Sequence, residues 1–460
     1  MKMAMYLFVI ALIGCSSAAA TERQILSCDT TTGFGTNGGV APSTAPTHVE
    51  GSGAVRVTVT GTGYTFKALA AGDQGSFWNS YNGIALRVRG QSGAQWGVID
   101  IWYDSSAYFH YYATFPIDPG VWTDVVIPWN EFTQRNFAGP IENHRAEVFG
   151  ISFRNVLAHD EAAPLGVAPA QIYDVDDIRL VDGISVTTPT NGTGDLRNTV
   201  AKMVAQQPVT IIVMGASITW GLKLQPNQQT NRWSSQLETL LRNHYGYSNI
   251  NIINTAVGGH NSWEGAISLG YDVYSHGNID LVIVGDYYYN DYDDAIGQGG
   301  PPEVADNFGR VFDLLLSHGF YSKAFPAHET LFCNGGLHAE PGNLNRNDTY
   351  LAAVETEVAA RNIPTANYYY PLQALGEPYL STNYYVYSGD YAHPNTAGHT
   401  YIADKIYNAI ISAGGPVGNP VSVSASSVSF SAPEGSVTPV TRTITLHNTS
   451  GGSITVTPSN

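Results

Sequence analysis

A run of apolar, mostly β-branched residues that ends in a serine-bearing turn constrains the fold of this chain more than any other feature. The run extends from Val209 to Met214, and the next five residues, 215–219, read Gly-Ala-Ser-Ile-Thr. A continuous apolar run of this length predicts a strand buried on both faces, as in a parallel sheet. Ligand sites in open α/β sheets gather at the carboxyl ends of the strands. We therefore expect Ser217 on a tight turn at the functional edge of such a sheet.

The region from residue 195 to 414 repeats this alternation of strand and helix. Apolar runs predict strands at 208–214, 250–256, 279–284, 325–332 and 365–370. Helical patterns predict helices at 195–206, 232–244, 303–317, 347–361 and 396–412. Together they predict a three-layer α/β domain in which helices cover both faces of a parallel sheet.

Residues 24–185 have an all-β pattern. Apolar and polar residues alternate, for example at Val55, Val57 and Val59, and short runs of this kind separated by turns predict a β-sandwich. The stretches 122–129 and 173–180 resemble the closing strands of jelly-roll carbohydrate-binding domains, which implies a carbohydrate-binding-like module. Five tryptophans could form a sugar-stacking platform, although packing in the core is their commoner fate; they are Trp78, Trp96, Trp102, Trp122 and Trp129.

The remaining segments are linkers and terminal regions. Residues 186–194 predict a linker, and 415–460 predict a second linker with a partial immunoglobulin-like β segment, too short for a complete sandwich. Residues 1–20 predict a signal peptide, in which Lys2 precedes an apolar run too short to span a bilayer. A competing interpretation is a lipobox ending at Cys15, which would then carry lipid.

Charge and export limit the partners that we expect. A net charge of −17 repels nucleic acid and anionic lipid, so we expect no nucleic-acid partner, and a membrane partner only if Cys15 is lipidated. We expect the protein to be exported: secreted, periplasmic or on the outer surface. Cys28 and Cys333 lie in different predicted domains, and we expect both to be unpaired.

Asp390 and His393 lie three residues apart, just before a helical pattern. A serine hydroxyl is a weak nucleophile and needs a base within hydrogen-bond reach. Ser217, His393 and Asp390 can supply the nucleophile, the general base and the group that orients the base. In the alternative without a catalytic role, Ser217 only caps a helix, Asp390 is a helix N-cap and His393 is a surface histidine.

Four separated blocks resemble those of the SGNH (GDSL-type) hydrolase family: 215–219, 254–259, Asn290 with Asp291, and Asp390 with His393. The resemblance implies that the backbone N–H groups of Ser217 and Gly259 and the amide of Asn290 donate to the oxyanion. The chain departs from the family at Ala216, where Asp is usual. In the third block a tyrosine replaces the glycine, and the block lies one residue farther from its strand, which a β-bulge could absorb.

The two resemblances together imply a two-domain carbohydrate acetylesterase. We expect a serine esterase that removes acetyl or other short acyl groups from an acetylated polysaccharide or oligosaccharide, with no metal or organic cofactor required. Two alternatives stay open. One is a lipid or aryl-ester hydrolase of the same family, and the other is a non-catalytic carbohydrate-binding surface protein.

Two groups of residues could suggest a metal ion. The spacing of His328, Cys333, His338 and Glu340 matches no established ligand pattern, so we expect loop residues near the active site instead. Asp174, Asp176 and Asp177 could hold a structural calcium in the sandwich, since carboxylate oxygens suit this ion, or they could be solvated carboxylates.

Overall fold

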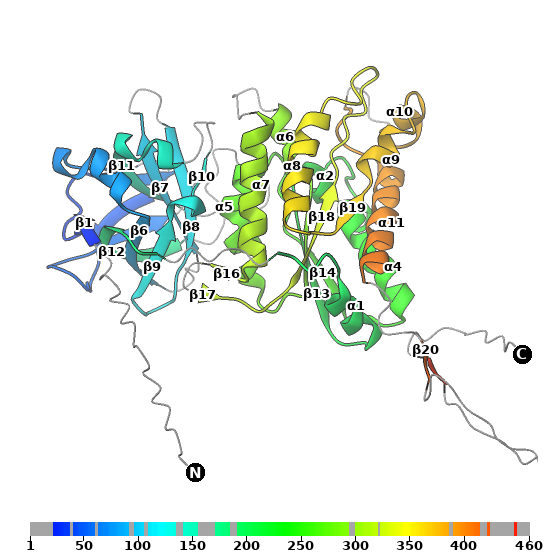
Figure 1. Ribbon diagram of the computed structural model, residues 1–460, viewed down its shortest axis with the longest axis horizontal. Helices are drawn as coiled ribbons and strands as arrows, with labels where there is room; N and C mark the ends of the chain where they lie inside the picture. Colours follow the sequence, from blue (N-terminus) through cyan, green and yellow to red (C-terminus); the bar gives the residue numbers. More distant parts are fainter. Residues whose placement is uncertain are drawn as a thin grey trace, which may run out of the picture.

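The structure is a computed structural model that describes most of the chain. The chain folds into two domains that pack against each other (Figure 1). The described residues are 22–36, 40–59, 63–91, 96–104, 109–134, 141–154, 171–184, 191–293, 300–320, 323–385, 390–414, 421–423 and 446–448.

The first domain is a sandwich of two antiparallel sheets, as expected. One sheet has the strand order β3-β4-β12-β6-β9, with β1 paired to β12, and the other has the order β10-β8-β7-β11-β5-β2. Alternation decides which side chains are buried: Val55, Val57 and Val59 of β4 point into the core, and the residues between them are half-buried. The strands are β1 (Glu22–Leu26), β2 (Phe34–Thr36), β3 (Val40–Thr44), β4 (Val55–Val59), β5 (Tyr64–Ala68), β6 (Gly83–Gly90), β7 (Trp96–Tyr103), β8 (Phe109–Pro116), β9 (Thr123–Pro128), β10 (Thr133–Gln134), β11 (Val148–Arg154) and β12 (Gln171–Val181).

Short 3-10 helices connect these strands. They are η1 (Ala71–Asp73), η2 (Ser76–Ser80), η3 (Trp129–Glu131), η4 (Ile141–Asn143) and η5 (Arg145–Glu147). Trp78 and Trp129 stack on each other in the sandwich core, with ring centroids 5.8 Å apart. These two tryptophans therefore pack as core residues.

The second domain is a parallel sheet of order β14-β13-β15-β18-β19. Its strands are β13 (Val209–Met214), β14 (Ile250–Asn254), β15 (Leu281–Val284), β18 (Glu329–Asn334) and β19 (Thr365–Asn367). Five of the six residues of β13 are buried and Thr210 is half-buried, as expected of a central parallel strand. A small hairpin, β16 (Gly319–Phe320) and β17 (Lys323–Ala324), lies outside this sheet.

Helices cover both faces of the parallel sheet, as expected. Helices α4 and α11 pack together on one face, while α5, α7 and α8 lie on the other (Figure 1). The helices are α1 (Arg197–Val204), α2 (Ser217–Trp220), α3 (Gln228–Asn231), α4 (Trp233–Tyr245), α5 (Ser262–Asp272), η6 (Tyr274–His276), α6 (Tyr287–Asp293), α7 (Pro301–Leu316), α8 (Asp348–Ala360), α9 (Tyr369–Gln373), α10 (Tyr379–Asn383) and α11 (Thr396–Ala413).

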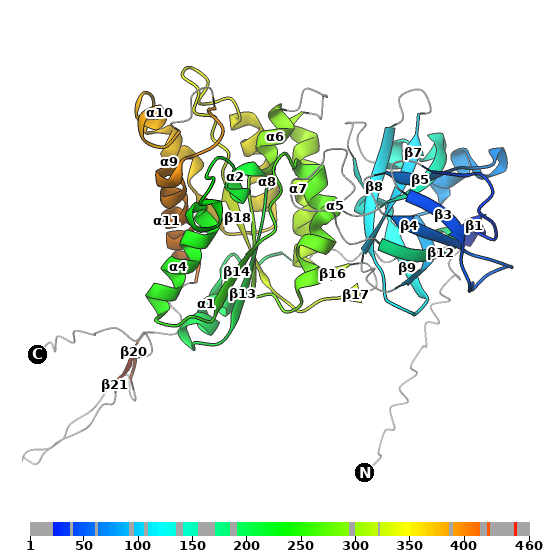
Figure 2. The ribbon, with the colours of Figure 1, turned by 180° about the vertical axis from the view of Figure 1, so that it is seen from behind.

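Helix α5, which the sequence pattern did not predict, joins the two domains. The sandwich packs on α5 (Figure 2), and the ring of Trp263 on α5 stacks on Tyr112 of β8 at 5.0 Å. Thr114 donates a hydrogen bond to the carbonyl of Ile267. Trp96 lies so close to Gly270 that a Cβ added there would come within 2.4 Å of the indole. Part of the outer face of this sandwich sheet is therefore an interdomain contact.

The bulge that could have absorbed the extra residue before Asn290 does not occur. Strand β15 pairs in regular register with both neighbours, and Asn290 lies within α6. Cys28 and Cys333 are buried and not bonded to each other, as expected.

The terminal predictions lie largely outside the described residues. The signal peptide and Cys15 belong to residues that the structure does not describe. Of the immunoglobulin-like segment, only β20 (Val421–Val423) and β21 (Leu446–Asn448) are described, and they pair antiparallel. Within the described part of the chain, no helix has the length and apolarity needed to cross a membrane.

Candidate active site

Ser217 lies at the first position of α2, directly after the carboxyl end of β13. Its side chain is almost buried, and its Oγ lies 2.9 Å from Nε2 of His393. The two residues are 176 positions apart in the sequence. The helix is only four residues long because Gly221 ends it with a φ of +87°, a left-handed conformation that glycine adopts without strain.

The imidazole of His393 is held on its other side by Asp390. Nδ1 of His393 lies 3.0 Å and 2.9 Å from the two carboxylate oxygens. Because an ionised carboxylate can only accept, Nδ1 donates and Nε2 is left to accept from the Ser217 hydroxyl. The backbone N–H groups of Ala392 and His393 also donate to Asp390. The structure thus brings all three predicted residues into one hydrogen-bonded series.

Asp390 has surroundings that keep it ionised. Partial burial acts to raise the pKa of this carboxyl, but the neighbouring His393 and the hydrogen bonds from His393 and Ala392 outweigh burial, so its pKa lies below the usual value. Lys223 lies 3.6 Å from the carboxylate. An ionised carboxylate at this position stabilises the imidazolium that forms when His393 takes a proton.

The turn that carries Gly258 and Gly259 lies close to Ser217. A Cβ added at Gly258 would come within 3.9 Å of the Ser217 Cβ and 3.2 Å of the Trp220 ring, so this turn approaches Ser217 closely. Gly259 has a φ of +88°, which favours glycine. The amide of Asn290 donates one N–H to the carbonyl of His260 at 2.6 Å and keeps a second N–H.

Asp286 holds the turn at Ser217, although no sequence motif marks it. Its buried carboxylate accepts hydrogen bonds from the backbone N–H of Ala216 at 3.2 Å, from that of Ile218 at 3.1 Å, and from the Thr219 hydroxyl. Burial raises the pKa of Asp286, and these donors oppose that rise. The residue therefore fixes the turn on both sides of Ser217.

The signal for Asp286 was its position. It follows β15, next to the central strand β13, so its side chain was bound to lie at the same sheet edge as Ser217. In the sequence, residues 285–289 stand out only as a departure from the family pattern.

A second network supports the turn that carries Gly259. Asn261 caps α5 in a capping box with Glu264. The backbone N–H and hydroxyl of Ser262 donate to Asp291, and Asn307 of α7 donates to the Ser262 hydroxyl at 3.0 Å. This network joins α6, which carries Asn290, to the helix that follows Gly259.

Asn254 connects the second sequence block to the first. Its amide nitrogen donates to the carbonyl of Thr219 and to the hydroxyl of Ser234, both at 2.8 Å. Its amide oxygen accepts from the backbone N–H of Ala256. Asn254 thus has a positioning role between α2 and the Gly258-Gly259 turn.

The residues considered for metal binding are dispersed. His338 pairs with Glu340 at 3.1 Å near the catalytic loop, where the N–H of Ala339 donates to the carbonyl of Tyr391. Cys333 is inside β18, and His328 lies before that strand. Within the described ranges, no group of three or more His, Cys, Asp or Glu is placed to hold a metal ion.

The calcium candidates in the sandwich bind arginines and backbone groups. Asp174 accepts from Arg56 and Arg89, at 2.7 Å and 2.5 Å. Asp177 pairs with Arg179, and Asp176 accepts from backbone N–H groups at residues 49 and 50. The described residues give no support to a calcium site here.

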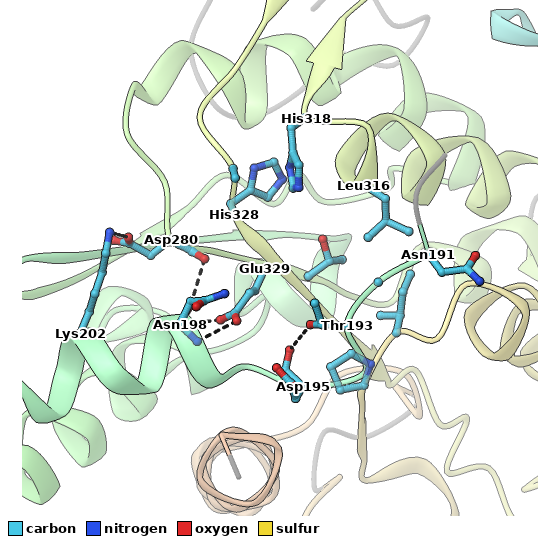
Figure 3. Close-up of a pocket in the computed structure, with 16 residues that line it drawn as sticks. Asn191, Thr193, Asp195, Asn198, Lys202, Asp280, Leu316, His318, His328 and Glu329 are labelled. Atoms are coloured by element: carbon cyan, nitrogen blue, oxygen red, sulfur yellow. Dashed lines mark hydrogen bonds and ion pairs between the residues drawn. The ribbon is translucent and has the colours of Figure 1, made fainter. Parts of the chain in front are cut away.

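A cavity of about 470 Å³ lies at the opposite, amino-terminal edge of the parallel sheet (Figure 3). Its wall includes His318, His328 and Glu329, whose carboxylate accepts from the first backbone N–H groups of α1. Lys202 pairs with Asp280 at its rim. None of the predicted catalytic residues lines this cavity.

Residues 16–154 match the family model of the Complex I intermediate-associated protein 30 (CIA30). No curated protein matches the chain in sequence.

Solved structures resemble parts of this chain. The acetyl xylan esterase AlAXEase is similar over 44% of this chain and 100% of its own, with 16% identity and a TM-score of 0.36. Est24, a carbohydrate acetylesterase from Sinorhizobium meliloti, is similar over 44% of this chain and 99% of its own, with 15% identity and a TM-score of 0.34.

The family 11 carbohydrate-binding module from Clostridium thermocellum, in complex with a mixed-linked tetrasaccharide, is similar over 36% of this chain and 98% of its own, with 18% identity and a TM-score of 0.29. These likenesses concern the fold of parts of the chain alone.

Proposed function

We propose that this chain is an exported serine esterase that removes acetyl groups from a polysaccharide. The observation that carries the proposal is the series of hydrogen bonds from Ser217 through His393 to Asp390. If Ser217 were only a helix cap and His393 only a surface histidine, there would be no reason for their side chains, 176 residues apart, to meet with this geometry.

The proposed reaction has two steps. In the first, His393 Nε2 takes the proton of the Ser217 hydroxyl while Oγ attacks the acetyl carbonyl carbon. The N–H groups of Ser217 and Gly259 and the amide of Asn290 stabilise the oxyanion. When the tetrahedral intermediate collapses, the ester C–O bond breaks and His393 gives the proton to the sugar oxygen, which leaves as a hydroxyl.

The second step restores the enzyme. His393 takes a proton from water, and the hydroxide attacks the acetyl carbonyl of the acyl-enzyme. Collapse breaks the bond to Ser217 Oγ, which regains its proton from His393 and releases acetic acid. Asp390 stays ionised throughout, consistent with its lowered pKa.

A polysaccharide substrate is supported by the organisation of the chain. A sandwich with closing strands like those of carbohydrate-binding domains is packed on the same helix, α5, that follows the oxyanion turn. Such a module adjacent to the active site suits a polymeric substrate. The predicted signal peptide extends the proposal to an exported protein that meets its polymer outside the cell.

The test compares wild type, Ser217→Ala and the control Ser248→Ala, an exposed serine on the turn before β14. The substrates are acetylated xylan, 4-nitrophenyl acetate and a long-chain 4-nitrophenyl ester. We expect acetate release from xylan in wild type and in the control and a loss of about a thousandfold or more in Ser217→Ala. Equal activity in Ser217→Ala would remove the proposal, and a preference for the long-chain ester would favour a lipid esterase.

A further inference from the structure

A second cavity lies between the two domains. It has a volume of about 510 Å³, within the range of roughly 300–1,000 Å³ that is usual for small-ligand sites. One wall belongs to the sandwich, at η3, β10 and η4, and the other to α7 and α8. We call this cavity the interdomain cleft. Ligand sites occur preferentially at domain interfaces.

The two walls of the interdomain cleft offer different chemistry. The sandwich wall includes the polar residues Asn130 and Thr133 beside Trp129, which is 2% exposed and packs mainly in the sandwich core. Trp129 is held in place because its Nε1 donates to the carbonyl of Tyr81 at 2.7 Å. The helix wall carries Asp306 of α7 and Glu357 of α8. Amide, hydroxyl and carboxylate groups on facing walls suit a sugar, which has many hydroxyl groups that can donate and accept hydrogen bonds.

The charges in the interdomain cleft favour a neutral ligand. Arg361 is occupied by Asp313 at 2.6 Å and by Glu357 at 2.5 Å. The guanidinium of Arg310 is almost buried, and its Nη2 lies 2.8 Å from Glu131 of the sandwich. The cations of the cleft are thus paired, while Glu142 and Asp306 add negative charge. An anionic ligand would be repelled.

A buried donor also faces this interface without a partner. Nε of Arg310 is buried and donates to no acceptor within the described part of the chain. Asp306 and Glu357 place two carboxylates on the helix wall. A neutral hydroxyl can donate to such carboxylates and accept from a guanidinium.

We propose that the interdomain cleft is a saccharide-binding site that takes a short, neutral, unacetylated stretch of the polysaccharide. This inference rests on the proposed function, since it assigns the cleft to the same polymer. Asn307, which lines the cleft, donates to Ser262 at the start of α5, and Ser262 donates to Asp291 beside Asn290. A chain held in the cleft is therefore attached to the same packed unit as Ser217, which raises the local concentration of its acetyl groups.

The structure offers a matched pair of variants at Gly309, which lines the cleft from α7. A Cβ added there would lie 3.0 Å from Arg361 Nη2 and 3.1 Å from Glu357 Oε2, the movable ends of flexible side chains. Gly309→Ala therefore adds one carbon and favours the helix, whereas Gly309→Phe fills the cleft with a ring. Asp306→Ala is an additional variant, because this exposed side chain can be removed without a cavity.

Calorimetry on the full chain measures binding of xylotetraose, cellotetraose and mannotetraose, with tetragalacturonate as the anionic comparison. We expect at least one neutral tetrasaccharide to bind wild type and Gly309→Ala alike, and to bind Gly309→Phe and Asp306→Ala about tenfold more weakly or worse. Tetragalacturonate should bind more weakly than that neutral ligand. For 4-nitrophenyl acetate, kcat/KM should be unchanged in all three variants, while KM for acetylated xylan rises in Gly309→Phe.

The inference is overturned if no neutral tetrasaccharide binds wild type, or if Gly309→Phe and Asp306→Ala bind as wild type does. Failure of the proposed function gives a different result. In that case Ser217→Ala releases as much acetate as wild type. Calorimetry still tests the interdomain cleft separately, because it measures binding and not ester hydrolysis.

Discussion

Replacement of Asp286 tests how the turn at Ser217 is held. Its carboxylate accepts from two backbone N–H groups and one hydroxyl, all buried. A hydrogen bond to a charged group contributes about 1.5–3 kcal/mol, and the two N–H groups cannot turn to another partner, so Asp286→Ala should cost about 3–6 kcal/mol. Because Asp286→Ala also removes the cost of burying a carboxylate, we expect a loss of about 3 kcal/mol, the lower end of this range.

This loss has two measurable consequences. For a domain of this size, 1 kcal/mol corresponds to roughly 2–4 °C in Tm, so Asp286→Ala should lower Tm by about 6 °C or more. A displaced Ser217 should lower kcat on 4-nitrophenyl acetate by about a hundredfold. Asp286→Asn retains one acceptor oxygen, so its free energy of unfolding should fall by about half as much as in Asp286→Ala. Thr219→Val removes one donor and should lower the free energy of unfolding by about 1 kcal/mol. Wild-type kcat and Tm in Asp286→Ala would refute this reasoning.

Three further variants test other parts of the structure. Asn290→Ala should lower kcat by about a hundred- to thousandfold with little change in KM, and equal kcat would remove Asn290 from the oxyanion site. Burial raises the pKa of Asp272 to about 7, above its unfolded value near 3.9, so stability should fall as pH rises through this window, by up to about 4 kcal/mol. Denaturant titrations at pH 5 and pH 8 should show about 3 kcal/mol of this loss in wild type, and a smaller loss in Asp272→Asn. Gly270→Val should clash with Trp96 and lower Tm by several degrees relative to Gly72→Ala, whose added Cβ meets no atom within 4 Å.

The sequence predicted the α/β domain because its strands are buried on both faces and its outer helices are amphipathic. Helix α5 gave no such signal, since ten of its eleven residues are buried against the sheet on one side and the sandwich on the other. Because all sides of α5 are covered, its buried residues do not form a single apolar stripe that a helical sequence pattern would reveal. The interdomain contact that covers it joins residues more than 150 positions apart, such as Thr114 and Ile267.

The catalytic candidates were predictable because each follows a recognisable strand or precedes a helix. Ser217, His393 and Asp390 meet as expected. Asp286 was not recognised, because a buried carboxylate that supports a turn has no local pattern. The tryptophans could be assigned only in part: Trp129 is a core residue, whereas Trp96 packs against the second domain. Sequence alternation marks a buried face without telling what covers it.

Covalent labelling tests the central claim most directly. A 4-nitrophenyl phosphonate mimics the ester, loses 4-nitrophenolate when a nucleophile attacks phosphorus, and leaves an adduct that mass spectrometry locates in a peptide. We expect one adduct per chain, on Ser217, with labelling slowed by about a thousandfold in His393→Ala. An adduct on a different residue, or an unlabelled Ser217 in a preparation that still releases acetate from xylan, would contradict the account.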